Sequence, residues 1–191
     1  MTLNGPSMPE RFSKDTAYII GRWLHWLAAV LFLMMVVGTD IWTSYAESRE
    51  QREVLDYWHI SLGSIFVILL FFRIGWVIRY PELRTHFDSR WQAIAARSNH
   101  WALYCLMIAM PLSGLVTQLF SGDPVSLFGQ TLLVMPEAVF DINEGIFADD
   151  AAEYSEILHL FLKWPIYTLL CLHILGALTH WLKSALQRRS Q

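Results

Sequence analysis

The sequence has few charged residues and few cysteines, and it is not expected to begin with a secretory signal. Charged residues make up 16% of its 191 residues and hydrophobic residues 54%, which excludes an ordinary soluble or disordered chain and indicates a membrane protein. Cys105 and Cys171 lie in separate apolar runs, so neither a disulfide framework nor a metal site is expected, and both thiols are expected to be buried and inert. Residues 1–16 are polar and lack a cleavable apolar core, so the first apolar run is expected to be a retained helix.

Four apolar runs are long enough to cross a bilayer, which takes about 20 residues. They cover approximately residues 17–39, 57–78, 101–120 and 158–182. Tryptophan and tyrosine cluster at their ends, as in the interfacial belts of membrane proteins. Pro111 and Pro165 lie inside the third and fourth runs, where a helix bundle tolerates them. The sequence therefore predicts an all-α fold, a bundle of four transmembrane helices in a single membrane domain, residues 1–191.

Basic residues are missing from one long connection, and this predicts the orientation. Residues 121–157 contain eight carboxylates and no lysine or arginine, and between the first two runs five carboxylates outweigh Arg49 and Arg52. Basic residues lie instead before or near the start of the first run, between the second and third, and after the fourth: Arg11, Lys14, Arg22, Arg79, Arg84, Arg90, Arg97, Lys183, Arg188 and Arg189. By the positive-inside rule, both termini are expected to be cytoplasmic and the acidic connections to face the periplasm or its equivalent.

Four histidines in the apolar runs fall into two pairs by depth. His159 and His173 are fourteen residues apart, close to four helical turns, so they share one helix face about 21 Å apart along the axis. His59 enters the second run from the acidic side, at the level of His159. His25 lies about 12 Å deep from the basic side, and His173 about 15 Å deep from the same side. We therefore expect an outer pair, His59 with His159, and an inner pair, His25 with His173.

Paired imidazoles on different helices suit the two axial positions of a haem. Filling both positions leaves a six-coordinate iron, which favours electron transfer over oxygen binding, and four-helix bundles hold cofactors between facing helices. Zinc or copper fits less well, because no carboxylate or thiolate set lies nearby to complete the coordination. The sequence has no Cys-x-x-Cys-His motif, so two non-covalent, b-type haems are expected. A single intramembrane histidine could instead make an interhelical hydrogen bond or relay protons.

Three further residues are candidates for binding at the inner level. Arg73 lies fourteen residues after His59 on the same face, where it would pair with propionates of the inner haem; snorkelling to the interface is the alternative. His180 follows His173 by seven residues, and its depth at the membrane edge favours an interfacial role, although spacing alone permits it as the inner ligand. His100 begins the third run, either as a helix-end histidine or as a contact to a haem propionate or a quinone.

Several short motifs together resemble one known family. They are RWLHW at 22–26, WHISLG at 58–63, MPLSGL at 110–115, SGDPVSLFG at 121–129, and LH at 158–159 with a second histidine fourteen residues on. The pattern resembles the bacterial cytochrome b561 family of dihaem membrane proteins, which is related to cytochrome b subunits of nickel hydrogenases and formate dehydrogenases. It implies that His25 and His173 hold an inner haem b, and that His59 and His159 hold an outer one. It also implies a multi-pass protein of the bacterial inner membrane that exchanges electrons with ubiquinone or menaquinone, and similar proteins are often homodimers.

Three functions follow from these expectations. The first is a dihaem electron-transfer protein that links the quinone pool to a donor or acceptor at the other surface, with a quinone site near Arg73, His100 and His180. The second is a superoxide oxidase with ubiquinone as acceptor, an activity of one branch of the family that the chain resembles. The third is a cytochrome b anchor subunit of a larger oxidoreductase. No nucleic-acid partner is expected, and the short chain leaves no room for a separate catalytic domain.

The acidic outer connections bear on this choice. Superoxide is an anion, and electrostatic steering changes encounter rates by ~10 to 10³-fold. Arg49, Arg52 and Lys163 could form a local positive funnel, but the surrounding carboxylates better suit a cationic periplasmic electron carrier or protein subunit. The sequence therefore favours the electron-transfer protein, with the oxidase and the anchor subunit as alternatives.

Overall fold

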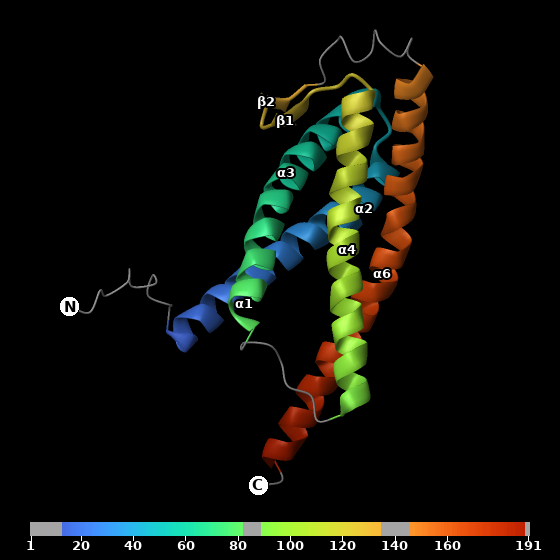
Figure 1. Ribbon diagram of the computed structural model, residues 1–191. Coiled ribbons are helices and arrows are strands. Elements are labelled where there is room, and N and C mark those ends of the chain that lie inside the picture. The colour runs from blue at the N-terminus through green and yellow to red at the C-terminus, as the bar shows by residue number, and fades with distance from the viewer. Residues whose placement is uncertain (1–12, 82–88, 135–145, 190–191) are drawn as a thin grey trace, which may run out of the picture.

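The computed structural model describes residues 13–81, 89–134 and 146–189 (Figure 1). Its helices are α1 (Lys14–Leu33), α2 (Thr39–Tyr45), α3 (Arg49–Arg79), α4 (Arg90–Phe120) and α6 (Ile146–Arg189). A π-helical turn, Met34–Gly38, joins α1 to α2 without a break. A short antiparallel hairpin follows α4 and consists of β1 (Val125–Leu127) and β2 (Gln130–Leu133). Arg11 and Arg84 of the predicted charge pattern, and residues 135–145 of the acidic connection, lie outside the described residues.

The prediction of four long apolar helices is confirmed. The helical stretches that are long and apolar enough to cross a membrane are Lys14–Tyr45, Arg49–Arg79, Arg90–Phe120 and Asp150–Arg188. Each contains one predicted run and extends beyond it, most of all α6, whose 44 residues give a length of about 66 Å. Ser48 shows why α3 begins early, in the polar connection: its hydroxyl accepts from Gln51 N at 3.2 Å, and Gln51 Oε1 accepts from Ser48 N at 3.1 Å, which is a capping box.

The helices pack as two antiparallel pairs (Figure 1). The α1 helix packs against α3, and α4 runs beside α6, whereas close approaches between the two pairs are few. Trp76 Nε1 donates to the Ala17 carbonyl at 3.1 Å, and a Cβ at Gly21 would lie only 3.2 Å from that nitrogen, so glycine permits this close crossing of α1 and α3. The start of α1 and the end of α6 lie toward one end of the bundle, and the hairpin lies at the other.

The core is an apolar layer between the two histidine levels. Its buried side chains are Ala28, Phe32, Val36, Phe66, Leu70 and Ile166. The rings of Phe32 and Phe66 stack with centroids 5.2 Å apart, and Ile166 is fully buried. Each of these three lies seven residues, about two turns, from a candidate histidine on its own helix, which places the layer between the outer and the inner histidines. Most other large apolar side chains are exposed on the outside of the helices, where a membrane protein meets lipid.

The prediction that both thiols are buried is wrong. Cys105 and Cys171 are free and exposed, on the outer faces of α4 and α6. The physical reason is that lipid is as apolar as a helix interface, so the lipid-facing side of a spanning helix carries the same residue types as its packed side. An apolar run in the sequence therefore does not reveal which face is buried.

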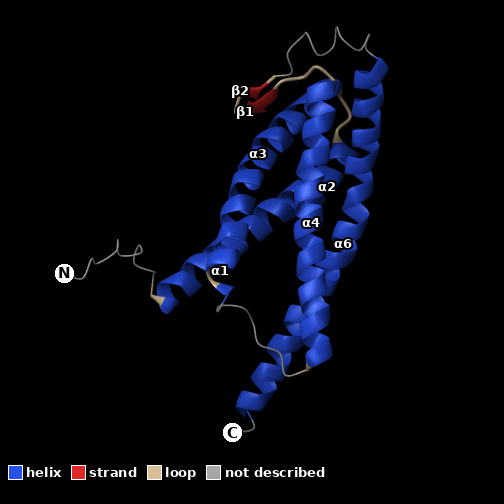
Figure 2. Cartoon of the chain, viewed as in Figure 1, coloured by secondary structure: helices blue, strands red, loops and turns tan. Residues whose placement is uncertain are grey.

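The hairpin is an addition to the predicted all-helical fold (Figure 2). Phe128 and Gly129 have φ angles of 48° and 82°, as in the two-residue turns that match the twist of a hairpin. Phe128 N donates to Ser61 Oγ at 3.0 Å, and the Phe128 ring lies 6.0 Å from that of Trp58. The hairpin is thereby docked on the third and fourth turns of α3, next to His59.

Candidate functional site

The outer histidines face each other from α3 and α6. The ring centroids of His59 and His159 are 6.0 Å apart, with the ring planes at 81°. His59 Nδ1 lies 3.0 Å from the hydroxyl of Thr39, the first residue of α2. His159 Nδ1 lies 2.8 Å from the Met110 carbonyl oxygen and 3.1 Å from Ser113 Oγ. When each Nδ1–H donates to these oxygens, the Nε2 of each ring is left to bind a metal.

The MPLSGL segment of α4 contacts the His159 ring and restricts its position. Ser113 Oγ donates to the Met110 carbonyl at 2.7 Å, so its lone pairs are available to accept from His159. A Cβ at Gly114 would lie 3.0 Å from His159 Cε1, so a larger residue would push the ring aside. This segment carried part of the family resemblance, and the structure shows that it forms a cradle for an outer histidine.

Three imidazoles meet at the inner level. The ring centroids of His25 and His173 are 6.2 Å apart, with the planes at 68°. His100, on α4, comes closer to His173, with the centroids 5.1 Å apart. His25 and His173 are half-buried and His100 is exposed. His180 is also exposed and lies about 10 Å further along α6 than His173.

Arg73 supplies a positive charge to this inner group. Its guanidinium carbon lies 5.9 Å from the centroid of the Tyr104 ring, and it interacts electrostatically with all three inner histidines. Among the residues that the structure describes, no carboxylate forms an ion pair with Arg73. A cation inside a membrane bundle is costly without a partner, so the inner level is suited to an anionic group from a ligand.

The spacing within each histidine pair fits a haem. A metal lies about 2 Å from an imidazole nitrogen and the ring centre about 1 Å behind that nitrogen, so two axial rings on one iron have centres about 6 Å apart. The observed separations are 6.0 and 6.2 Å. In the described part of the chain, no group of three or more His, Cys, Asp or Glu is placed to hold a metal ion. Each pair could therefore supply the two axial ligands of an iron whose other four ligands come from a porphyrin.

A second polar cluster ties α2 to α6 near the outer pair. Lys163 Nζ lies 2.9 Å from Asp40 Oδ1, and the Tyr167 hydroxyl donates to Asp40 Oδ2 at 2.8 Å. Arg49 pairs with Glu53 at 2.8 Å on the surface of α3. Two of the three cations that could form a positive funnel, Lys163 and Arg49, are therefore each paired with a carboxylate.

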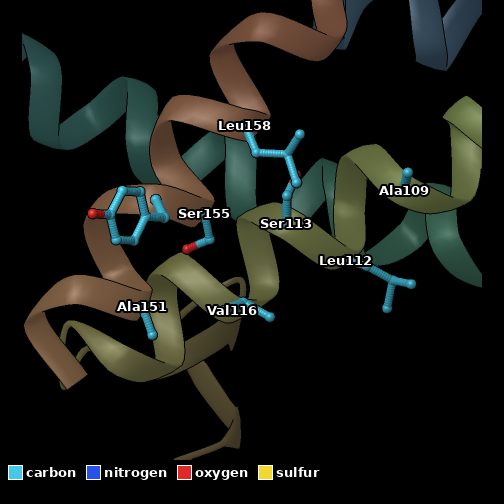
Figure 3. Close-up of a pocket in the computed structure, with 8 residues that line it drawn as sticks. Ala109, Leu112, Ser113, Val116, Ala151, Ser155 and Leu158 are labelled. Atoms are coloured by element: carbon cyan, nitrogen blue, oxygen red, sulfur yellow. The ribbon is translucent and has the colours of Figure 1, made fainter. Parts of the chain in front are cut away.

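A shallow groove lies between α4 and α6 beside the outer pair (Figure 3). Its volume is about 500 Å³, and apolar residues such as Leu112, Val116 and Leu158 line most of it. Ser113 and Ser155 also line it, but their hydroxyls are engaged with neighbouring groups of the two helices. The groove therefore offers an apolar surface, as suits an alkyl chain, rather than a polar binding site.

Comparison with known proteins establishes the family. The family described as prokaryotic cytochrome b561 matches residues 19–188. This chain belongs to that family. It is 30% identical over 175 residues to cytochrome b561 homolog 2 of Escherichia coli (strain K12), covering 90% of this chain and 85% of the relative. It is 29% identical over 158 residues, 82% of this chain and 84% of the relative, to a protein of Yersinia pestis named probable superoxide oxidase CybB. No solved structure gives a significant match.

Membership confirms the resemblance that the motifs indicated, and it implies haem b in this cytochrome b561. The number of haems and their ligands stay predictions. Sequence patterns predicted no role for Thr39, Met110 or Ser113, which hold the outer rings. Ser113 lies within a motif that carried the resemblance, so that motif was an available signal. No pattern in the sequence around Thr39 indicates its role, because its contact with His59 depends on how α2 packs on α3.

Proposed function

We propose that this cytochrome b561 is a dihaem electron-transfer protein that links the membrane quinone pool to a donor or acceptor at the outer surface. His25 and His173 would hold the inner haem b, and His59 and His159 the outer one. The observation that carries the proposal is the presence of two facing imidazole pairs, with centroids 6.2 and 6.0 Å apart, at levels about 21 Å apart along α6. A haem held in this way supplies one-electron exchange at a six-coordinate iron.

The surrounding residues have separate roles in this scheme. Thr39 and the Met110 carbonyl accept from the Nδ1–H groups of the outer histidines and so fix their tautomer, with Nε2 directed at the metal. Arg73 would pair with the propionates of the inner haem, because its planar donor fork matches a carboxylate. The stacked Phe32 and Phe66 exclude water between the two levels.

The charge distribution supports an orientation with both termini in the cytoplasm of a bacterium and the outer pair toward the periplasm. Lys183 and Arg188 lie in the last turns of α6, beyond His173, whereas Glu153 and Glu156 precede His159 on the same helix. An acidic periplasmic end would attract a cationic electron carrier or a basic protein subunit, and charge steering would speed that encounter.

The quinone site of this proposal lies near the inner haem. His100 is exposed, and its ring centroid lies 5.1 Å from that of His173, so it could donate to a carbonyl of ubiquinone or menaquinone that arrives through the bilayer. Arg73 and His180 are the other donors at this end. A quinone-site inhibitor should slow reoxidation of the reduced haems by added quinone, and an unchanged rate would argue against this site.

The test of the ligand scheme is a reduced-minus-oxidised absorption spectrum of the purified protein, with haem quantified per chain. We expect two b-type haems in the unmodified protein, one in His173→Ala and two in His180→Ala. Absence of haem from the unmodified protein, or equal loss from the two variants, would overturn the proposal. The two variants are matched because both remove an imidazole from α6.

A superoxide oxidase is the second candidate, and the 29% identical relative with that name favours it. The pairing of Lys163 with Asp40 and of Arg49 with Glu53 weakens it, because these cations would otherwise attract an anionic substrate. Stopped-flow consumption of superoxide by the purified protein, with ubiquinone present, separates the two candidates. A rate no higher than that of the haem-free protein would exclude the oxidase.

A further inference from the structure

The antiparallel pair formed by α4 and α6 has a register that repeats at the two histidine levels. Ser113 on α4 lies opposite His159 on α6, 3.1 Å away. One turn further along α4, Thr117 lies opposite Ser155, one turn earlier on α6, with the hydroxyls 2.9 Å apart. Asn99 lies fourteen residues before Ser113 on α4, and His173 lies fourteen residues after His159 on α6. Because the two helices are antiparallel, both steps lead toward the inner level. The register therefore places Asn99 opposite the inner histidine, as Ser113 is opposite the outer one.

The neighbouring residue confirms that this part of α4 is at the inner level. The ring of His100 lies 5.1 Å from that of His173, centroid to centroid. Asn99 precedes His100 and is more buried. Among the described residues, Asn99 Oδ1 is the buried side-chain polar atom that lacks a hydrogen-bond partner. Such atoms are rare in folded proteins, and each one needs an explanation.

We propose that Asn99 is a positioning residue for His173 in the haem-loaded protein: its Oδ1, which has no partner in the structure, would accept the hydrogen bond of the His173 Nδ1–H and so fix the ring with Nε2 directed at the inner haem iron. This role rests on the dihaem function proposed above. It gives the orphaned acceptor a donor, and it repeats at the inner level what Met110 and Ser113 do for His159. The α4 helix, which supplies no proposed haem ligand, would then orient both ligands of α6.

The proposed bond has a consequence for the iron. An acceptor on Nδ1–H raises the basicity of the imidazole and stabilises the oxidised metal. Removing the acceptor should therefore raise the midpoint potential of the inner haem, and a carboxylate in its place should lower it. A purely structural role of Asn99 in packing α4 on α6 predicts no such opposite shifts.

The experiment is a redox titration of the purified holoprotein, followed by its visible spectrum, for Asn99→Leu and Asn99→Asp. Asn99→Gln tests rescue by a conservative change, and the exposed neighbour in Ser98→Ala is the matched control. We expect the haem that is lost in His173→Ala to shift up in Asn99→Leu and down in Asn99→Asp, each by about tenfold in its reduction equilibrium, or ~59 mV for one electron. The midpoint potential of the other haem should not change. In Ser98→Ala and Asn99→Gln, both midpoint potentials should stay near those of the unmodified protein.

The outcomes separate this inference from the proposed function. Three results would overturn the role of Asn99 and leave the dihaem function intact, provided that both haems are bound. They are an unchanged midpoint potential of the inner haem, a shift of the same sign in Asn99→Leu and Asn99→Asp, and a shift of the outer haem alone. If Asn99→Leu loses the inner haem, the midpoint potential of that haem in Asn99→Asp still tests the role: a downward shift supports it, and no downward shift overturns it. Absence of haem from the unmodified protein would overturn the function and this role together.

Discussion

The outer and inner histidine levels differ in how far the polypeptide itself fixes the ligand geometry. At the outer level, oxygens of Thr39, Met110 and Ser113 hold both rings through Nδ1. At the inner level, the rings of His25 and His173 receive no hydrogen bond from the described residues, and the charge of Arg73 has no carboxylate beside it. The outer site is organised before any cofactor arrives, whereas the inner site is completed by one.

Removing an outer ligand should have the largest effect. We expect His159→Ala to lose the outer haem alone, since the inner pair is on a separate level and keeps both of its imidazoles. Haem per chain, measured chemically on the purified variant, should fall from two to one, and His100→Ala should retain two. Loss of both haems from His159→Ala would show that the two levels do not assemble independently.

A methyl group beside the outer ring should have the next largest effect. In Gly114→Ala the new Cβ would lie 3.0 Å from His159 Cε1, so the ring must move away from its hydrogen bonds. We expect roughly a tenfold loss of affinity for the outer haem, within the range found when partners of metal ligands are changed. Gly176→Ala is the matched control, because nothing lies within 4 Å of a Cβ there. Equal haem retention in both variants would contradict the cradle.

Arg73→Gln tests the charge of the inner level. A nearby cation favours the reduced haem, so its removal should lower the midpoint potential of the inner haem by about tenfold in the equilibrium constant, or ~59 mV. The control is Arg79→Gln, which removes a guanidinium that lies 5.4 Å from the Tyr80 ring near the end of the same helix. A shift of the outer haem in place of the inner one would mean that Arg73 has been assigned to the wrong level.

Asp40→Asn should have the smallest effect, and it acts at the outer level. The substitution leaves the Lys163 charge without its carboxylate partner, so reduction of the oxidised protein by an anionic donor such as ascorbate should speed up about two- to threefold at low salt and not at high salt. Glu53→Gln frees the far more exposed Arg49, with 93% of its side chain exposed, and should change the rate less. Stopped-flow reduction at two ionic strengths measures both.

The features that could be predicted from the sequence depend on properties of one helix at a time. Each apolar run is long enough to span a membrane, and counting residues from the charged ends predicted how His25, His59, His159 and His173 pair. The structure places these four histidines side by side in the expected pairs, as their ring separations show.

Other features depend on how two segments meet, and for these the sequence holds no local signal. The exposure of Cys105 depends on the rotation of α4 about its axis. The contact of Thr39 with His59 depends on how α2 packs against α3. The role of Asn99 depends on the register of α4 against α6. The hairpin turn at Phe128 was missed because its strands have three and four residues, too few to show an alternating pattern.

The apolar layer of Phe32, Phe66 and Ile166 has a consequence for energy conversion. In the proposed dihaem protein an electron passes about 21 Å of a hydrocarbon core that is about 30 Å thick, while the dry layer stops a proton or another ion from following it. Each transfer would therefore move net charge against or along the membrane voltage, with up to about 2.3 kcal/mol per 100 mV at stake. Electron transfer through the proposed dihaem bundle would therefore be electrogenic, and an energised membrane would oppose it in one direction and drive it in the other.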